Sequence, residues 1–543
     1  MRYAIALDIG TSGFRCQAID LDTGATVATS ITDRHPIPGM NVIDHVNYAM
    51  KKGEDTANAL MIGAINNLFA TLGIDLSKVV RVAVCGNPFQ LSLFQNIEIR
   101  DLAYAGKKKL ERLGIVSPPR NGDVVKASDL GLAGMPDAEV IIPPAVTHEI
   151  GADAMAMMLT TDILNQKEPC IVVDYGTNAE MALVVDGMVY TGSAASGPAL
   201  EGQQISRGML AAPGAVSAVE VTPQGWRCYI LDDSMAAAEG DLVNPSTGEI
   251  VEKGAMHGRA KGITGTGLVA ALSAGMETGL INPPKILTED GKLYLQDGIT
   301  ITSKDVEEAG KAIGALRAGF LTLMDYAGLW TGDVVKAYMS GASGLYVDAK
   351  KALKIGMVLP GATDITQFGN TSITLARRVA VGEVGLEDLR TFAANLKSTH
   401  CMFASSEFFK NLYGIEYSLW CSGMPVSEYN GMCAIYDIKP IPMDPDVSGV
   451  NVRRVTVRDL PDTEGKVVTT IECGTVLKGE VQGCVGCGLC ESECPEGAIS
   501  IEMLGKSYVA SIRSDRCGGT ACRRCERSCP EGALDTLSLK LGS

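Results

Sequence analysis

Eight cysteines are concentrated in a short stretch near the C-terminus, between Cys484 and Cys529. The first four follow the pattern C-x2-C-x2-C-x3-C-P, a spacing that lets one tight loop bring three thiolates to one iron–sulfur cluster. The second four repeat this pattern, but their first gap is four residues instead of two. Zinc sites do not call for a third and fourth cysteine followed by proline, so iron–sulfur binding is favoured over zinc.

The two motifs predict two [4Fe-4S] clusters. In two-cluster ferredoxins the fourth cysteine of each motif binds the cluster of the other motif, and the same crossing is expected here. The stretch between the motifs alternates as a short hairpin should, so we expect a ferredoxin domain of the α+β type over residues 476–543. Cys517 is the ligand whose spacing departs from the pattern. The two expected ligand sets are Cys484, Cys487, Cys490 and Cys529, and Cys517, Cys522, Cys525 and Cys494.

A unit of strand, glycine turn and strand occurs twice in the rest of the chain. Its first strand ends on Asp8 in one copy and on Asp174 in the other. Glycine amides and hydroxyl groups bind phosphate oxygens, and the aspartates can hold Mg²⁺ or orient water. One such turn alone suits an ordinary hairpin equally well, whereas the pair predicts a phosphate site. The expected phosphate-binding residues are Gly10, Thr11, Ser12, Gly13, Gly176, Thr177 and Asn178.

A third glycine motif, at Gly341 and Gly344, lies between a predicted strand and a predicted helix. By itself it is equally typical of an ordinary tight turn. With the paired turns it resembles the actin, sugar kinase and Hsp70 ATPase superfamily. The resemblance implies an α/β ATPase of two duplicated half-domains that binds ATP and Mg²⁺, with these two glycines in the adenosine pocket. Glu180 and Glu201 are weaker candidates, since a solvated carboxylate and a helix cap explain them as well.

Three further glycine-rich stretches, over residues 192–209, 262–281 and 369–382, are similar to the reductive activators of corrinoid proteins. Members of that family use ATP and iron–sulfur clusters to return cobalt(II) to cobalt(I). This chain starts with the ATPase and ends in the two-cluster domain, unlike the members that carry an N-terminal [2Fe-2S] domain. It is similar instead to the activators that serve the methylamine methyltransferases of methanogens.

That resemblance implies an ATP-hydrolysing oxidoreductase. Its implied partners are corrinoid proteins of methylamine methyltransferases and a low-potential electron donor. Two alternatives remain open. An activator of a radical dehydratase or reductase usually shares one cluster across a dimer and does not need eight cysteines. A ferredoxin-type relay with a vestigial ATPase would reduce cobalt without dependence on nucleotide.

The domains expected from these motifs are two ATPase halves over residues 1–168 and 169–395, a connecting region over 396–475, and the ferredoxin domain. The connecting region is rich in aromatic residues and methionine, for which core packing is favoured over a docking surface. Buried thiols are expected at four further cysteines, and structural roles at all five histidines. These residues are Cys401, Cys421, Cys433 and Cys473, and His35, His45, His148, His257 and His400.

The overall charge and the apolar pattern exclude several classes of function. A net charge of −16 disfavours nucleic acid as a partner. No apolar run reaches the roughly 18 residues that a membrane span requires. The N-terminus has a short strand-like stretch followed at once by Asp8, where a signal peptide would have a longer apolar region. We therefore expect a cytoplasmic protein.

Overall fold

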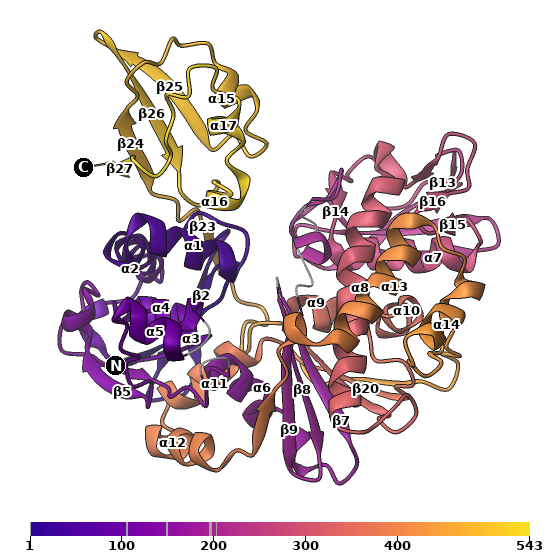
Figure 1. The fold of residues 1–543 in the computed structure, drawn as a ribbon, viewed down its shortest axis with the longest axis horizontal. Helices are drawn as coiled ribbons and strands as arrows, with labels where there is room; N and C mark the ends of the chain where they lie inside the picture. Colours follow the sequence, from indigo (N-terminus) through magenta and orange to yellow (C-terminus); the bar gives the residue numbers. More distant parts are fainter. Residues whose placement is uncertain are drawn as a thin grey trace. The chain divides into compact units, whose positions relative to one another are not determined.

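The chain folds into two compact units, shown as a ribbon in Figure 1. Unit 1 contains Met1–Ala156, Thr371–Leu396 and Leu460–Ser543, and unit 2 contains Met157–Asn370 and Lys397–Asp459. The chain therefore returns to unit 1 twice. Residues 371–395, expected in the second ATPase half, pack in unit 1. The computed structural model describes residues 2–104, 107–147, 150–176, 178–194, 198–201 and 204–542.

A seven-stranded sheet forms the centre of unit 1. Three strands form antiparallel hairpins, β4 and β6 follow parallel to β1, and β5 closes one edge antiparallel to β6. The middle strand β1 is buried along almost its whole length, as expected for a strand covered on both faces. In sheet order the strands are β23 (Val468–Ile471), β3 (Thr26–Thr32), β2 (Phe14–Asp20), β1 (Tyr3–Ile9), β4 (Val79–Gly86), β6 (Glu139–Ile142) and β5 (Asp123–Lys126).

Helices accompany this sheet, and α6 runs across the boundary of the two units. They are α1 (Val42–Lys52), α2 (Glu54–Ala70), α3 (Pro88–Phe94), α4 (Arg100–Ala103), α5 (Lys107–Leu113), α6 (Ala152–Thr160), α11 (Thr371–Ala380) and α12 (Leu386–Asn395).

The cysteine-rich end of the chain forms a small α+β fold within unit 1. Its sheet has the order β25-β26-β24-β27, and β25 and β26 form the hairpin expected between the two motifs. The strands are β24 (Val476–Glu480), β25 (Ile499–Leu504), β26 (Ser507–Arg513) and β27 (Lys540–Leu541), and the helices are α15 (Leu489–Ser492), α16 (Gly519–Cys522) and α17 (Arg524–Arg527).

The main sheet of unit 2 repeats the topology of the unit 1 sheet, except that its last strand is parallel to its neighbour, whereas β5 is antiparallel to β6. In both sheets an antiparallel three-stranded hairpin is followed by two parallel strands, and a late strand joins the hairpin edge in parallel. The expected duplication of the ATPase is therefore present in the topology. The strands in order are β21 (Ser398–His400), β9 (Met188–Ala194), β8 (Ala179–Val185), β7 (Cys170–Tyr175), β19 (Lys336–Ser340), β20 (Asp364–Gln367) and β22 (Asn451–Arg454).

Unit 2 also contains a second, five-stranded sheet and two small hairpins. The sheet strands are β10 (Ala215–Thr222), β11 (Gly225–Leu231), β12 (Ala237–Val243), β13 (Ile250–Glu252) and β14 (Gly262–Ile263), and the hairpins are β15 (Ile281–Asn282) with β16 (Lys285–Ile286) and β17 (Lys292–Tyr294) with β18 (Thr300–Thr302). The helices are α7 (Gly265–Glu277), α8 (Ser303–Tyr326), α9 (Gly341–Tyr346), α10 (Ala349–Ile355), α13 (Glu407–Ser422) and α14 (Val426–Ile435).

The aromatic part of the connecting region fills the core of unit 2. Trp420 of α13 is fully buried, and a Cβ atom added at Gly310 of α8 would lie 2.5 Å from its Cβ. The Arg317 Nη1 and Glu416 Oε1 atoms lie 3.3 Å apart in the same helix pair, and the Tyr429 hydroxyl donates to that carboxylate. Core packing thus accounts for these aromatic residues. Among the four cysteines expected to be buried thiols, Cys421 is half-buried and Cys401, Cys433 and Cys473 are buried.

In the described part of the chain, no helix has both the length and the apolar composition needed to cross a membrane.

Candidate nucleotide loops and iron–sulfur site

The first expected phosphate loop is the turn between β1 and β2 in unit 1. Asp8, one residue before the end of β1, is almost fully buried, and its Oδ2 lies 3.4 Å from the Arg15 Nη1 on the facing strand. A Cβ atom at Gly10 would lie 3.0 Å from the Gly13 carbonyl oxygen, and one at Gly13 would lie 2.8 Å from the Thr32 Oγ1. The turn is therefore too tight for larger residues at these two positions, and its backbone is held next to β3.

A second carboxylate accompanies Asp8, which the sequence reasoning missed. Burial raises the pKa of Asp153, in the first turn of α6, to about 6, and the charge of Asp8 adds to this rise. Burial and both carboxylates also raise the pKa of the Cys85 thiol, which lies opposite Asp8 in the β1–β4 register. A buried acidic group whose pKa is raised by a neighbouring carboxylate favours a bound cation or a shared proton. No sequence motif marked Asp153, because it lies far from the turn along the chain.

The second expected phosphate loop is the turn between β7 and β8 in unit 2. Asp174 faces Glu180 on β8 and Ser340 on β19. The Gly176 amide donates a 3.2 Å hydrogen bond to the Asn178 carbonyl oxygen, which closes the turn. Thr177 lies outside the described residues, as does His148, and the side chain of Glu201 is not described.

The structure brings the third glycine motif against the second phosphate loop. Gly341 starts α9 with φ +79°, and a Cβ atom there would lie 2.5 Å from the Asp174 Oδ1. A Cβ atom at Gly344 would lie 3.0 Å from the Tyr175 ring. Both glycines therefore permit close approach of α9 to the end of β7. Asp174, Gly176 and the α9 N-terminus are thus one local constellation within unit 2.

Four cysteines of the first expected set line one cavity. Cys484, Cys487 and Cys490 of the first motif lie in its wall with Cys529 of the second. The backbone amide of Gly486 donates to the Cys484 Sγ at 3.5 Å. Backbone amides outweigh burial and lower the pKa of Cys529. Amide donors aimed at sulfur are what a thiolate bound to an iron–sulfur cluster needs, so the residues fit the group.

The second expected set is also close together. Burial raises the pKa of Cys517 to about 11, with further contributions from the neighbouring Cys494 and Cys522. Burial likewise raises the pKa of Cys525 to about 12, with Cys517 and Cys494 adding to the rise. Amides donate to two of these sulfurs, from Ala498 to Cys494 at 3.2 Å and from Gly519 to Cys517 at 3.4 Å. Such thiols ionise only when a cation binds them.

The extra residues of the second motif form a contact with the ATPase part of unit 1. They begin α16, which packs against α1. The Gly39 amide donates to the Cys517 carbonyl oxygen at 2.9 Å, and a Cβ atom at Gly519 would lie 2.8 Å from the Pro38 carbonyl oxygen. The wider gap before Cys522 therefore has a structural role. The residues in this gap contact the segment between β3 and α1.

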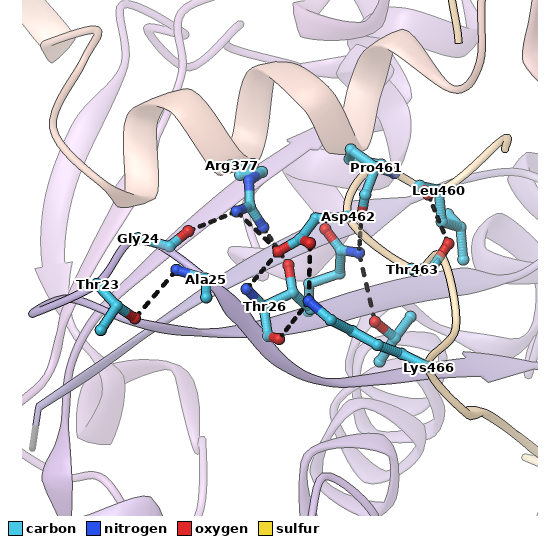
Figure 2. Close-up of polar contacts among 12 residues, drawn as sticks. Thr23, Gly24, Ala25, Thr26, Arg377, Leu460, Pro461, Asp462, Thr463 and Lys466 are labelled. Atoms are coloured by element: carbon cyan, nitrogen blue, oxygen red, sulfur yellow. Dashed lines mark hydrogen bonds and ion pairs between the residues drawn. The ribbon is translucent and has the colours of Figure 1, made fainter. Parts of the chain in front are cut away.

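A second attachment holds the segment that leads into the ferredoxin fold (Figure 2). Asp462 accepts hydrogen bonds from the Thr26 amide at 2.6 Å and from the Lys466 Nζ at 2.7 Å, and Arg377 lies 3.4 Å away. These donors outweigh burial and lower the pKa of Asp462 to about 2. We call these four residues the clasp. Just beyond it, β23 joins the ATPase sheet parallel to β3.

Comparisons with known proteins cover almost the whole chain. Residues 3–166 match the RACo middle region, residues 168–430 match the C-terminal ASKHA domain of RACo, and residues 483–533 match the 4Fe-4S dicluster domain. A solved structure of a reductive activator for corrinoid, iron–sulfur protein aligns with a TM-score of 0.62 at 23% identity, covering 78% of this chain and 68% of that one. The expected fold class is confirmed.

Two curated relatives also match. The chain is 47% identical over 522 residues to the Co(II) methylated amine-specific corrinoid protein reductase of Methanosarcina barkeri, with 96% of each chain covered. It is 25% identical over 379 residues to the corrinoid activation enzyme RamQ of Eubacterium limosum, which covers 66% of this chain and 60% of that enzyme.

Proposed function

Because the chain belongs to the family of reductive activators of corrinoid proteins, we propose that it uses ATP to return the cobalt(II) form of a corrinoid protein to cobalt(I). The observation that carries the proposal is the composition of unit 1. This unit joins the first phosphate loop to the cysteine motifs through β23, the clasp and the Gly39–Cys517 hydrogen bond. A free electron carrier would not need its linker to be a strand of an ATPase sheet.

The need for ATP follows from the energetics of the reaction. Low-potential ferredoxin clusters lie near about −400 mV. The cobalt(II)/cobalt(I) couple lies lower. A gap of about 100 to 200 mV for one electron corresponds to a factor of roughly 50 to 2,500 in the equilibrium, or about 2 to 5 kcal/mol. Hydrolysis of ATP releases more than this, provided that the nucleotide distinguishes two states of the protein.

Each phosphate loop would contribute the same kinds of group. Asp8 and Asp174 would hold Mg²⁺ or orient water, and the turn residues would donate amides and hydroxyls to phosphate oxygens. In unit 1, Asp153 joins Asp8 in offering negative charge to the cation. In unit 2, Gly341 and Gly344 would let adenosine approach the backbone beside Asp174. The phosphate-binding residues are Gly10, Thr11, Ser12, Gly13, Gly176, Thr177 and Asn178.

The eight motif cysteines would hold two [4Fe-4S] clusters, which supply one-electron transfer at low potential. The cavity lined by Cys484, Cys487, Cys490 and Cys529 supports one set. The mutual electrostatic influence of Cys494, Cys517, Cys522 and Cys525 supports the other. None of the sixteen cysteines forms a disulfide, which suits a reducing cytoplasm.

The substrate class follows from the relatives. The Methanosarcina protein is named for corrinoid proteins specific to methylated amines. Its alignment with this chain covers 96% of both chains at 47% identity. We assign the same class here, namely corrinoid proteins of methylamine methyltransferases, with a low-potential carrier as the electron donor. The net charge of −16 argues against nucleic acid as a partner.

The test is the visible spectrum of a corrinoid protein of a methylamine methyltransferase, followed under anaerobic conditions with this protein, a reductant and ATP. Cobalt(I) should appear only when ATP is present. Asp174→Asn should slow both ATP hydrolysis and cobalt reduction at least about 100-fold. Asp186→Asn, in the β8–β9 turn, is the matched control and should leave both rates unchanged. Cobalt(I) formation that is independent of ATP in the wild type would refute the proposal.

A further inference from the structure

Tyr48 of α1 has a buried hydroxyl group without a hydrogen-bond partner among the described residues. Its side chain is 3% exposed. The residue lines a cavity whose wall also contains Cys517, Gly519 and Thr520 of the second cysteine motif. An unsatisfied buried hydroxyl costs roughly 1 to 3 kcal/mol, so the hydroxyl is expected to have a partner inside the cavity.

The chemistry of the cavity wall indicates what that partner is. Thr536, another wall residue, donates its hydroxyl to Glu526, and the Tyr48 hydroxyl makes no hydrogen bond to it. Cys517 contributes a sulfur that must be ionised when it binds iron. Burial, with a further contribution from Cys517, raises the pKa of Tyr48. The phenol therefore stays protonated at neutral pH and acts as a hydrogen-bond donor.

We propose that Tyr48 donates its phenolic O–H to a sulfur of the cluster bound by Cys517, and that this bond raises the reduction potential of that cluster. The inference rests on the proposed function, since it requires the second cluster. A hydrogen bond to a cluster sulfur stabilises the more negative, reduced state. Tyr48 is thus a positioning residue that the ATPase part of unit 1 supplies to the ferredoxin part.

Polar contacts connect α1, the helix that carries Tyr48, to the first expected phosphate loop. His45, one turn before it on α1, lies 3.3 Å from the Gln90 Nε2 through its Nδ1. The backbone amide of Gln90 donates to the Asn87 Oδ1 at 2.9 Å. The Asn87 Nδ2 in turn donates to the Thr11 Oγ1 at 3.4 Å. The helix that presents Tyr48 is therefore tied to the expected phosphate-binding turn.

The experiment compares the reduction potentials of the two clusters in the full-length holoprotein. Tyr48→Phe removes only the hydroxyl group and keeps the ring that lines the cavity. In a potentiometric titration followed by electron paramagnetic resonance, one of the two steps should shift to lower potential. Its reduction should become three- to tenfold less favourable, or about 28 to 59 mV, while the other step stays in place.

Tyr229→Phe is the matched control, since it removes a tyrosine hydroxyl that donates to Glu220 in unit 2. It should leave both steps unchanged. Iron and sulfide analysis accompanies each titration, because about eight irons per chain are expected in all three proteins. Unchanged potentials in fully loaded Tyr48→Phe, or a shift to higher potential, would overturn the inference. About four irons in the wild type would instead refute the two-cluster assignment on which it rests.

Discussion

The amide of Gly39 donates a 2.9 Å hydrogen bond to the carbonyl oxygen of Cys517. Gly39 belongs to the segment that leads from the ATPase sheet into α1, and Cys517 is the first cysteine of the second motif. One bond thus joins the nucleotide-binding half of unit 1 to an expected cluster ligand. The residues added to the second motif lie at the same contact, so this departure from the usual spacing serves the attachment.

The tightness of that contact can be tested with two glycines of similar backbone conformation. Gly519 has φ +62° and Gly505 has φ +64°. Alanine at either position should lower the folding stability by about 1 to 2 kcal/mol, because the backbone of both residues is in the left-handed conformation. Only at Gly519 would the new Cβ meet a backbone atom, 2.8 Å away at Pro38, while nothing lies within 4 Å at Gly505. Gly519→Ala should therefore also lose iron, measured per chain, whereas Gly505→Ala should not. Equal iron contents would contradict this contact.

Asp153 should make stability depend on pH. Its pKa of about 6 lies above the ordinary value, so the folded state binds the proton more tightly than the unfolded state. Folding stability should fall as pH rises from about 4 to about 6, by on the order of 3 kcal/mol.

Asp153→Asn removes the free-energy cost of ionising this buried carboxyl group. In thermal unfolding without Mg²⁺ it should be more stable than wild type at pH 7.5, and this advantage should shrink at pH 5. Mg²⁺ should raise the unfolding midpoint of the wild type more than that of the variant. A pH-independent difference would show that the carboxylate is not perturbed.

The clasp should control access to the segment before the ferredoxin fold. Asp462→Ala removes the acceptor shared by Thr26, Arg377 and Lys466. Because the carboxylate is partly exposed, its loss should cost up to about 1 kcal/mol, which is roughly a fivefold larger open population. Limited proteolysis should then cut residues 460–475 correspondingly faster. Asp446→Ala is the control. It also removes a carboxylate from a loop, one that accepts a hydrogen bond from the Ser448 amide in unit 2, and it should not change this rate. A cutting rate equal to that of wild type would mean that β23 alone holds the segment.

The buried ion pair of unit 2 should be costly to break from one side. Arg317 and Glu416 have side chains 4% and 0% exposed. Glu416→Ala leaves the guanidinium buried without its counter-charge, and we expect a loss of about 3 to 5 kcal/mol. The double variant Arg317→Met/Glu416→Leu should recover most of that stability, because both charges are removed together. Thermal unfolding midpoints measure both effects, and a double variant no more stable than Glu416→Ala would contradict the explanation.

Local patterns in the sequence predicted much of the fold and of the candidate site. The two glycine turns indicated a duplicated ATPase, because an aspartate at the end of a strand followed by Gly-Thr can be read from neighbouring residues alone. The comparisons confirm that fold class. The same holds for the cysteine motifs, whose spacing is set by the size of the cluster they surround. The role of residues 371–396 could not be predicted this way, since α11 and α12 pack in the unit that the chain had already left.

The sequence by itself therefore determined the kinds of chemistry, namely iron–sulfur binding and phosphate binding, since both are written in short motifs whose residues are neighbours along the chain. Only the tertiary structure decided which distant groups accompany them. Asp153 comes close enough to Asp8 for the charge of Asp8 to raise its pKa, and Tyr48 lines one cavity with Cys517 where α1 packs against α16. Such pairs leave no local pattern, because their partners are separated by more than a hundred residues and come together only in the folded chain.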